Sequence, residues 1–122
     1  MKLKLLPDAL TVCKLASLSE ADLTSHFYFL AKTDEELSLV CATGDVPTRT
    51  TAREDGWRGL RVEGVLDFSL VGILARLSSA LAAEGISLFA VSTFNTDYLL
   101  VKADQLDGAI RALARTGYET EA

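Results

Sequence analysis

The chain has 122 residues, of which 49% are hydrophobic and 24% charged, and this length suits one ordinary domain or two very small ones. Such a composition supports a buried core and is atypical of disordered or fibrous chains. Twelve lysines and arginines against seventeen aspartates and glutamates give a net charge of -5, which repels phosphate backbones and anionic membranes. The numbers exclude a large multidomain enzyme and argue against nucleic-acid or membrane partners.

The N-terminal segment begins Met-Lys-Leu-Lys-Leu-Leu-Pro. Its apolar run is far too short for the hydrophobic region of a signal peptide. No stretch of the chain approaches the roughly 20 apolar residues that a membrane-spanning helix needs. We therefore expect a soluble, cytoplasmic protein.

The metal-ligating side chains are few and scattered. Cys13 and Cys41 lie in apolar, strand-like stretches without C-x-x-C spacing, and His26 is the single histidine. A metal site is therefore improbable. We interpret the cysteines as small buried hydrophobes in a reducing compartment, and His26 as a surface or strand-edge residue. We expect neither a metal nor a cofactor.

The first half of the chain alternates short apolar and polar stretches. Ser17-Leu-Ser-Glu20 has capping-box spacing and predicts a short helix through Leu23, and residues 33–36 predict a capped turn or a single helical turn. The polar run at 48–55 has the composition of a linker. We place a domain boundary there, between residues 1–55 and 56–122. Strands are predicted at 9–15, 27–31 and 37–41.

The second half begins with a strand at 60–64, where apolar and charged residues alternate after Trp57. A helix follows, with Asp67 or Ser69 as its N-cap and Gly85 as its C-terminal stop. Its apolar stripe, which indicates packing on a sheet, consists of Leu70, Ile73, Leu74, Leu77 and Leu81.

Residues 86–94 and 98–101 predict a hairpin with a turn at Asn95-Thr96. Both sheet faces are apolar in this interpretation. A second helix follows Asp104 and stops at Gly117, and 118–120 form a last strand. The predicted faces group Ile86, Leu88 and Leu100 on one side and Phe89, Val91, Leu99 and Val101 on the other.

The second half thus reads strand, helix, strand, strand, helix, strand, which predicts an α+β sandwich with helices on one face of an antiparallel sheet. The first half looks like a compressed version of the same unit.

Two segments carry a resemblance to a known family. Gly64-Val-Leu-Asp-Phe-Ser-Leu-Val-Gly72 and Ser92-Thr-Phe-Asn-Thr-Asp-Tyr98 resemble the ACT-domain superfamily, and more narrowly the small tandem-ACT proteins related to the CASTOR arginine sensors. Residues 27–47 are similar to the divergent first repeat of that group. The resemblance implies a ferredoxin-like βαββαβ fold in two tandem repeats, the first divergent or shortened. It also implies binding of a free amino acid as a regulatory signal, without chemistry.

A free amino acid presents an ammonium and a carboxylate, and each needs a partner if the ligand is enclosed. Asp97 at the hairpin bend suits the ammonium. The start of the helix after residue 72 suits the carboxylate, with glycines that allow close backbone approach. The resemblance implies that residues 92–94 form the facing wall. The candidate ligand-binding residues are Gly64, Leu66, Asp67, Phe68, Ser69, Gly72, Ser92, Thr93, Phe94 and Asp97.

Structural interpretations of the same residues stand beside these. Asp97 is also typical of a turn residue that bonds its own backbone. Asp67 and Ser69 suit a helix cap, and Gly72 suits tight helix packing. Ser92 and Thr93 suit a cross-strand hydrogen bond. Three aromatic residues suit a core or an interface: Trp57, Phe89 and Tyr98.

We therefore predict a non-catalytic regulatory module that binds a free amino acid between two ACT units, either within the chain or across a homodimer. We expect a homodimer that acts on a regulated protein partner. The alternative is a protein-interaction or oligomerisation domain without a ligand. An acylphosphatase-like enzyme would need a cationic phosphate cradle, but residues 64–72 contain Asp67 and no Lys or Arg. No phosphate-binding or dinucleotide-binding glycine motif occurs.

Overall fold

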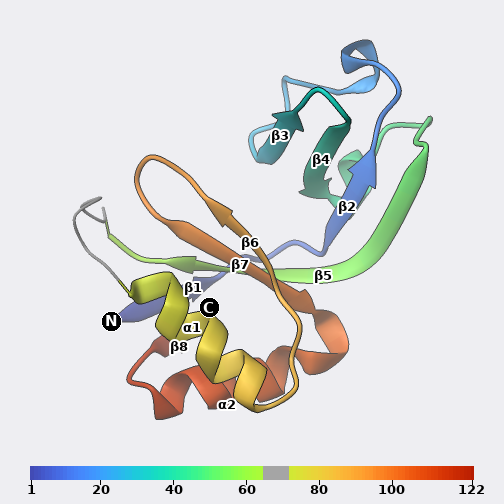
Figure 1. Ribbon diagram of the computed structural model, residues 1–122. Coiled ribbons are helices and arrows are strands. Elements are labelled where there is room, and N and C mark those ends of the chain that lie inside the picture. The colour runs from blue at the N-terminus through green and yellow to red at the C-terminus, as the bar shows by residue number, and fades with distance from the viewer. Residues whose placement is uncertain (65–71) are drawn as a thin grey trace. The chain divides into compact units, whose positions relative to one another are not determined.

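The computed structural model describes residues 1–64 and 72–122, and the chain divides into two compact units. The helical unit consists of Met1–Pro7 and Arg58–Ala122, and the strand unit of Asp8–Trp57 (Figure 1). Strand β5 (Ala52–Val62) belongs to both, because the boundary falls between Trp57 and Arg58.

The helical unit contains a mixed sheet with the strand order β6-β7-β5-β1-β8. From β5 onward its elements follow the predicted order of strand, helix, strand, strand, helix, strand, so the ferredoxin-like α+β class is confirmed. The bounds are β1 (Lys2–Leu5), α1 (Ile73–Ala83), β6 (Phe89–Ser92), β7 (Asp97–Lys102), the 3-10 turn η3 (Ala103–Gln105), α2 (Leu106–Arg115) and β8 (Glu119–Glu121).

Strand β1 was not predicted. It pairs antiparallel with β5 and parallel with β8, so it lies between two strands that are distant in sequence. A four-residue segment is stable as a strand only when such partner strands are present. The local sequence pattern therefore gives little indication of β1.

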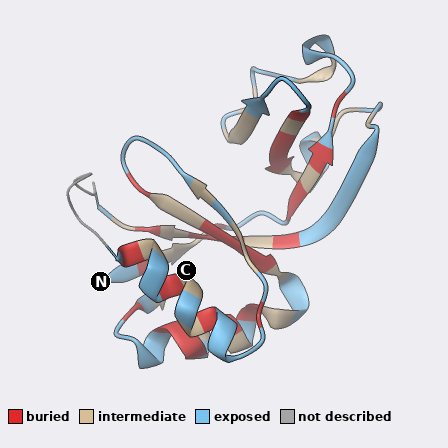
Figure 2. Cartoon of the chain, viewed as in Figure 1, coloured by how far each residue is buried: buried red, intermediate tan, exposed pale blue. Residues whose placement is uncertain are grey.

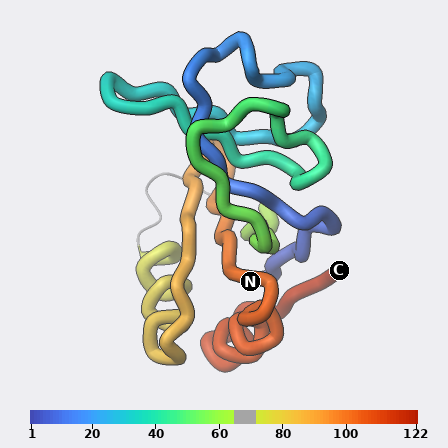
Figure 3. The backbone as a smooth tube through the Cα atoms, turned by 90° about the vertical axis from the view of Figure 1, so that its right-hand side faces the viewer, coloured from blue at the N-terminus to red at the C-terminus, as the bar shows by residue number. Residues whose placement is uncertain are grey.

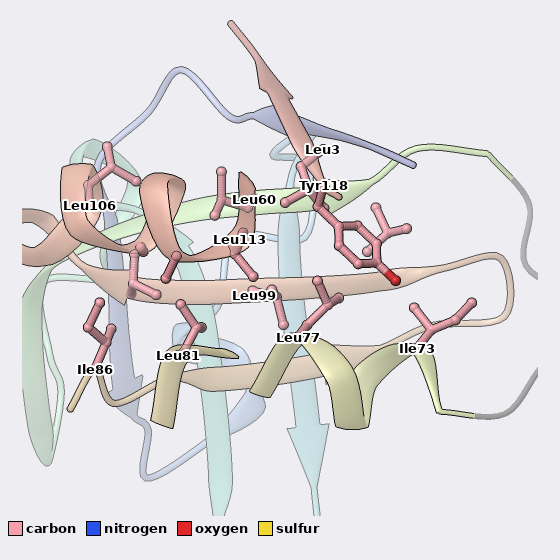
Figure 4. Packing of buried hydrophobic residues seen from close by; sticks show 14 residues of the cluster. Leu3, Leu60, Ile73, Leu77, Leu81, Ile86, Leu99, Leu106, Leu113 and Tyr118 are labelled. Carbon is pink, nitrogen blue, oxygen red and sulfur yellow. The ribbon is translucent and has the colours of Figure 1, made fainter. Parts of the chain in front are cut away.

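The two helices cover one face of this sheet. Figure 4 shows Leu77 and Leu81 of α1 and Leu113 of α2 over the strand residues Leu60 and Leu99. Burying these leucines supplies most of the favourable free energy, at roughly 25 cal/mol per Å² of apolar surface. Figure 3 shows α1 and α2 side by side, and Figure 2 shows that their buried residues lie on the inward side.

Helix α1 begins later than predicted. Its N-cap is Gly72, with φ of 83°, and not Asp67 or Ser69, both of which lie outside the described residues. Its end is as predicted: the Gly85 N–H donates to Ala82 O at 3.0 Å and the Ile86 N–H to Leu81 O at 3.0 Å. This pair of bonds, with Gly85 at a φ of 69°, is a Schellman motif.

The hairpin register corrects one predicted grouping. Phe89 lies opposite Leu100 and Ser92 opposite Asp97, so the turn consists of residues 93–96. Directly opposed residues share a face. Leu100 therefore lies on the same face of the sheet as Phe89 and not on the face of Leu88. Both faces are apolar, as predicted.

The strand unit has the sheet order β3-β4-β2-β5. Short 3-10 turns, η1 (Leu18–Glu20) and η2 (Thr43–Asp45), stand where a longer helix would follow β2 and β4. Ser17 caps η1 as predicted, but the helix through Leu23 is wrong. The predicted linker is also wrong over residues 52–55, which lie in β5. The other strands are β2 (Leu10–Lys14), β3 (Tyr28–Lys32) and β4 (Leu37–Ala42).

The two β-hairpins have the same turn. In the strand unit the Thr33 N–H donates to Glu36 O at 2.9 Å, and the Thr33 hydroxyl accepts from the Glu36 N–H at 3.1 Å. In the helical unit the Thr93 N–H donates to Thr96 O at 2.8 Å, and the Thr93 hydroxyl accepts from the Thr96 N–H at 3.4 Å. In each hairpin a six-residue strand follows the turn and leads into a 3-10 turn.

Candidate functional site

The Asp97 carboxylate, next to the turn of the β6–β7 hairpin, accepts a hydrogen bond through one of its two oxygens. The Ser92 hydroxyl donates to Asp97 Oδ1 at 2.6 Å, across a pair of residues in direct register. Asp97 is half-buried and begins β7. In the part of the chain that the structure describes, its second oxygen, Oδ2, accepts no hydrogen bond, so it is open to a cationic partner.

The alternation of β7 fixes which face this carboxylate occupies. Asp97 has the same parity as Leu99 and Val101, which pack in the core under the helices. Tyr98 has the opposite parity and interacts with Arg61, whose pKa is raised: burial acts to lower it, and hydrogen bonds with Glu63 and Tyr98 outweigh that effect. Asp97 and the Arg61 group thus lie on opposite faces.

The predicted wall of residues 92–94 is not one continuous surface within this chain. Ser92 points to Asp97. The Thr93 hydroxyl is engaged in the turn, where it donates to Thr96 O at 3.0 Å. The Phe94 side chain lies at the tip of the turn and is 79% exposed.

Thr96 is a functional candidate that the sequence analysis missed. Its side chain is only 7% exposed, and its hydroxyl donates to the backbone oxygen of Val62 at 2.6 Å. Val62 ends β5 two residues before Gly64, so this bond ties the hairpin bend to the start of the 64–72 segment. A threonine in a turn gives no sequence signal of burial.

The two glycines that flank this segment are required by the backbone. Gly64 has φ of 97° and Gly72 has φ of 83°, a region that side chains with a Cβ rarely adopt. A Cβ at either position would meet no described atom within 4 Å, so neither glycine is explained by tight packing. The candidates Leu66, Asp67, Phe68 and Ser69 lie outside the described residues.

The start of α1 receives no side-chain cap from the residues that the structure describes. Gly72 offers no side chain to cap it, and the first turn of α1 contains no acidic residue. The first N–H groups of a helix lack carbonyl partners within it and carry the positive end of the helix dipole. In Figures 1 and 4 this terminus, marked by Ile73, and the β6–β7 turn lie at the same end of the helical unit.

Other reactive groups give little support for catalysis. Burial, with nearby Cys13 and Asp45, raises the pKa of the Cys41 thiol to about 11. Burial also raises the pKa of Cys13. Both therefore remain neutral thiols at physiological pH. Within residues 1–64 and 72–122, no group of three or more His, Cys, Asp or Glu side chains is placed to hold a metal ion, and no helix is long and apolar enough to span a membrane.

The ACT-domain family model matches residues 52–115, which is more than half of the chain, so the chain belongs to the ACT-domain family. A curated relative is the human "Cytosolic arginine sensor for mTORC1 subunit 1", which is 39% identical over 67 residues. These residues are 54% of this chain and 20% of the relative. The match thus covers about a fifth of the relative's length.

Two solved structures are similar over most of the chain. A protein from Agrobacterium tumefaciens superposes with a TM-score of 0.86 at 32% identity, over 98% of this chain and 91% of its own. The ligand-free regulatory subunit of aspartate kinase from Thermus thermophilus superposes with a TM-score of 0.60 at 10% identity, over 93% of this chain and 95% of its own. At that identity, the second likeness shows the fold alone.

Proposed function

We propose that this chain is a non-catalytic regulatory module that binds a small free amino acid at an interface between two ACT units. The observation that carries the proposal is the Asp97 carboxylate, which Ser92 holds by Oδ1 at 2.6 Å and whose Oδ2 is open. An ammonium group is a suitable partner, because charge-assisted hydrogen bonds are the strongest that a carboxylate forms. The start of α1 suits the ligand's carboxylate.

The remaining candidates complete this proposed site. Gly64 and Gly72 adopt positive φ on either side of residues 65–71. Phe94 covers the ligand only if another ACT unit approaches, because it is 79% exposed in this chain. Thr93 holds the turn. The candidates outside the described residues, Leu66, Asp67, Phe68 and Ser69, are proposed as the loop wall of the same site.

The proposal includes two tandem ACT repeats, residues 1–55 and 56–122, with the first divergent. It is supported by the matching hairpins, since residues 28–45 and 88–105 run through the same strand, turn, strand and 3-10 turn. It is also supported by sheet order. The strand order is β3-β4-β2-β5 in the strand unit and β6-β7-β5-β8 in the helical unit, once the inserted β1 is left out. In both units, by order along the chain, the second, third, first and fourth strands follow one another across the sheet.

The names of the relatives support a regulatory role. The human relative is named as a cytosolic arginine sensor. By this likeness the chain acts in the cytoplasm, responds to a free amino acid and passes the signal to a protein partner as a homodimer.

A thermal-shift screen of the twenty amino acids tests the proposal. A ligand at about 100 times its dissociation constant adds roughly 2.7 kcal/mol to the free energy of unfolding, which is a readily measured shift. At least one amino acid is expected to give this shift. If none does at millimolar concentration, the ligand-free interaction domain, which the exposure of Phe94 favours, replaces the sensor.

A further inference from the structure

We propose that Thr96 is a positioning residue whose buried hydroxyl clamps the hairpin bend onto β5 and thereby sets the place of the Asp97 carboxylate. The inference rests on the proposed function, because it assigns a role in the same ligand site. It concerns a side chain that does not itself point to the proposed ligand: its hydroxyl donates to Val62 O at 2.6 Å, inside the protein.

The clamp differs from the other bonds at the bend. The Ser92 hydroxyl bonds Asp97, and Thr93 bonds Thr96, so both interactions join residues of the same hairpin. Such bonds hold the shape of the hairpin but do not join the bend to β5, the strand with which β7 pairs. The bond from Thr96 to Val62 spans 34 residues of sequence and joins the bend to a different strand.

Position matters at this point because a ligand would contact two elements at once. Asp97 follows Thr96 directly, and Val62 precedes Gly64 by two residues. If the 2.6 Å bond broke, the buried backbone oxygen of Val62 would be left without a donor, which costs free energy. The Thr96 hydroxyl therefore has one preferred geometry. Thr96 thus fixes the bend against the strand that leads toward the start of α1.

The strand unit provides an internal comparison. Its hairpin has the same turn, but the position that matches Thr96 is Glu36, which is exposed, and the position that matches Asp97 is Leu37. The hairpin without the carboxylate therefore also lacks the buried hydroxyl. Turn geometry alone does not require Thr96.

Three variants test the clamp. Thr96→Val removes the hydroxyl and keeps the shape of the side chain, whereas Thr96→Ser keeps the hydroxyl. Thr11→Val is the matched control, because Thr11 is fully buried and its hydroxyl donates to Asp55 at 2.7 Å in the strand unit. Thr96 and Thr11 are the buried polar residues of the described chain. Both valine variants are expected to lower stability by similar amounts.

The first readout is hydrogen exchange of the Thr93 amide, which needs no ligand. Thr96→Val is expected to speed this exchange about tenfold relative to Thr11→Val, because losing a buried hydrogen bond favours local opening. Thr96→Ser is expected to exchange as the wild type does. Equal exchange in Thr96→Val and Thr11→Val overturns the clamp.

The second readout is calorimetric affinity for the amino acid that gives the largest shift in the screen of twenty. Thr96→Val is expected to weaken binding about tenfold or more, with Thr96→Ser and Thr11→Val near wild type. Faster exchange with unchanged affinity overturns the positioning role. If the wild type binds none of the twenty, the proposed function fails, and the exchange comparison alone decides whether the clamp exists. Thr96→Ala, read in the same way, serves if Thr96→Val lacks a native circular-dichroism spectrum.

Discussion

The carboxylate of Asp97 begins β7, with Oδ1 bonded by Ser92 and with no hydrogen bond to Oδ2 from residues 1–64 and 72–122. Its neighbours explain this state. Ser92 holds Oδ1, and Leu99 on the same face is a core residue. Half-buried carboxylates with an open oxygen gain most from a cation that brings its own hydrogen-bond donors.

Asp97→Ala is expected to weaken amino-acid binding by about 2 to 4 kcal/mol, the usual scale for losing one partner of a buried charge pair. The fold should persist, because the side chain is half-buried and contributes no core contact. Titration calorimetry measures the affinity and urea unfolding the stability. Asp104→Ala is the control, since Asp104 is exposed on η3. Unchanged affinity in Asp97→Ala would remove Asp97 from the site.

The Cys41 thiol gives a pH dependence of known sign. Its pKa is raised from 9.0 to about 11, mainly by burial. Between these values the unfolded chain loses the proton and the folded chain keeps it, so the stabilisation present below about pH 9 is lost as the pH rises toward 11. Urea unfolding from pH 8 to 11 should show this fall. Cys41→Val should make the fall shallower, with the remainder due to Cys13, whose pKa burial also raises. An equally steep fall in that variant would show that other groups cause it.

At the scale of elements, two glycines of the second helix have opposite roles. Gly117 terminates α2 at a φ of 94°, where its N–H donates to Ala114 O at 3.0 Å. Gly108 lies inside the helix, and a Cβ there would have its nearest contact with Ile86 at 3.6 Å, an ordinary van der Waals distance.

Gly117→Ala is therefore expected to lower the free energy of unfolding by about 1 kcal/mol, because alanine is strained at positive φ. Gly108→Ala is expected to raise it by about 0.5 to 1 kcal/mol, since alanine has the higher helix propensity. Denaturant titration of both variants checks the pair. Changes of the same sign in the two would contradict this account.

The two hairpins predict the number of ligands. In the strand unit the register pair at the turn is Lys32 and Leu37, and Leu37 is buried, whereas in the helical unit it is Ser92 and Asp97. The first hairpin carries Asp34, Glu35 and Glu36 within its turn, but the register-paired carboxylate that the proposed site uses has no counterpart there. Calorimetry should thus give one amino acid per chain, and no binding after Asp97→Asn. A stoichiometry of two would require a second site in the strand unit.

Sequence pattern predicted the helical unit well because its helices carry apolar stripes and end at glycines. It failed where structure depends on distant partners. β1 needs β5 and β8, and the polar residues 52–55 form a strand because they pair with β2. At the candidate site, the place of Asp97 at the end of the bend was predicted, but the burial of Thr96 was not, because it results from a contact with Val62. The hairpin register, and with it the face of Leu100, also required coordinates.

At the scale of the whole molecule, the helical unit is assembled from both ends of the described chain. β1 pairs in parallel with β8, and Lys2 Nζ lies 2.7 Å from Glu121 Oε1. This ion pair is exposed and contributes little by itself. The stabilisation comes instead from Leu3, which is fully buried in the core of the helical unit. Folding of this unit therefore requires segments that enclose the strand unit in sequence.

Phe94 connects this architecture to the proposed homodimer. A phenylalanine that is 79% exposed at the tip of the site hairpin costs little to remove from the isolated fold, but it offers a large apolar contact to a second copy. Phe94→Ala is expected to leave the free energy of unfolding within about 0.5 kcal/mol of wild type. It should weaken self-association about tenfold or more in the presence of the bound amino acid.

Sedimentation equilibrium with and without the amino acid measures the association, and urea unfolding of dilute protein measures the stability. Leu23→Ala is the matched control, because Leu23 is 48% exposed in the strand unit and lies outside the proposed site. Phe94→Ala should differ from both the wild type and this control. Self-association that both variants leave unchanged would show that Phe94 takes no part in it. A wild type that stays monomeric with the ligand bound would show that the amino acid is enclosed within one chain.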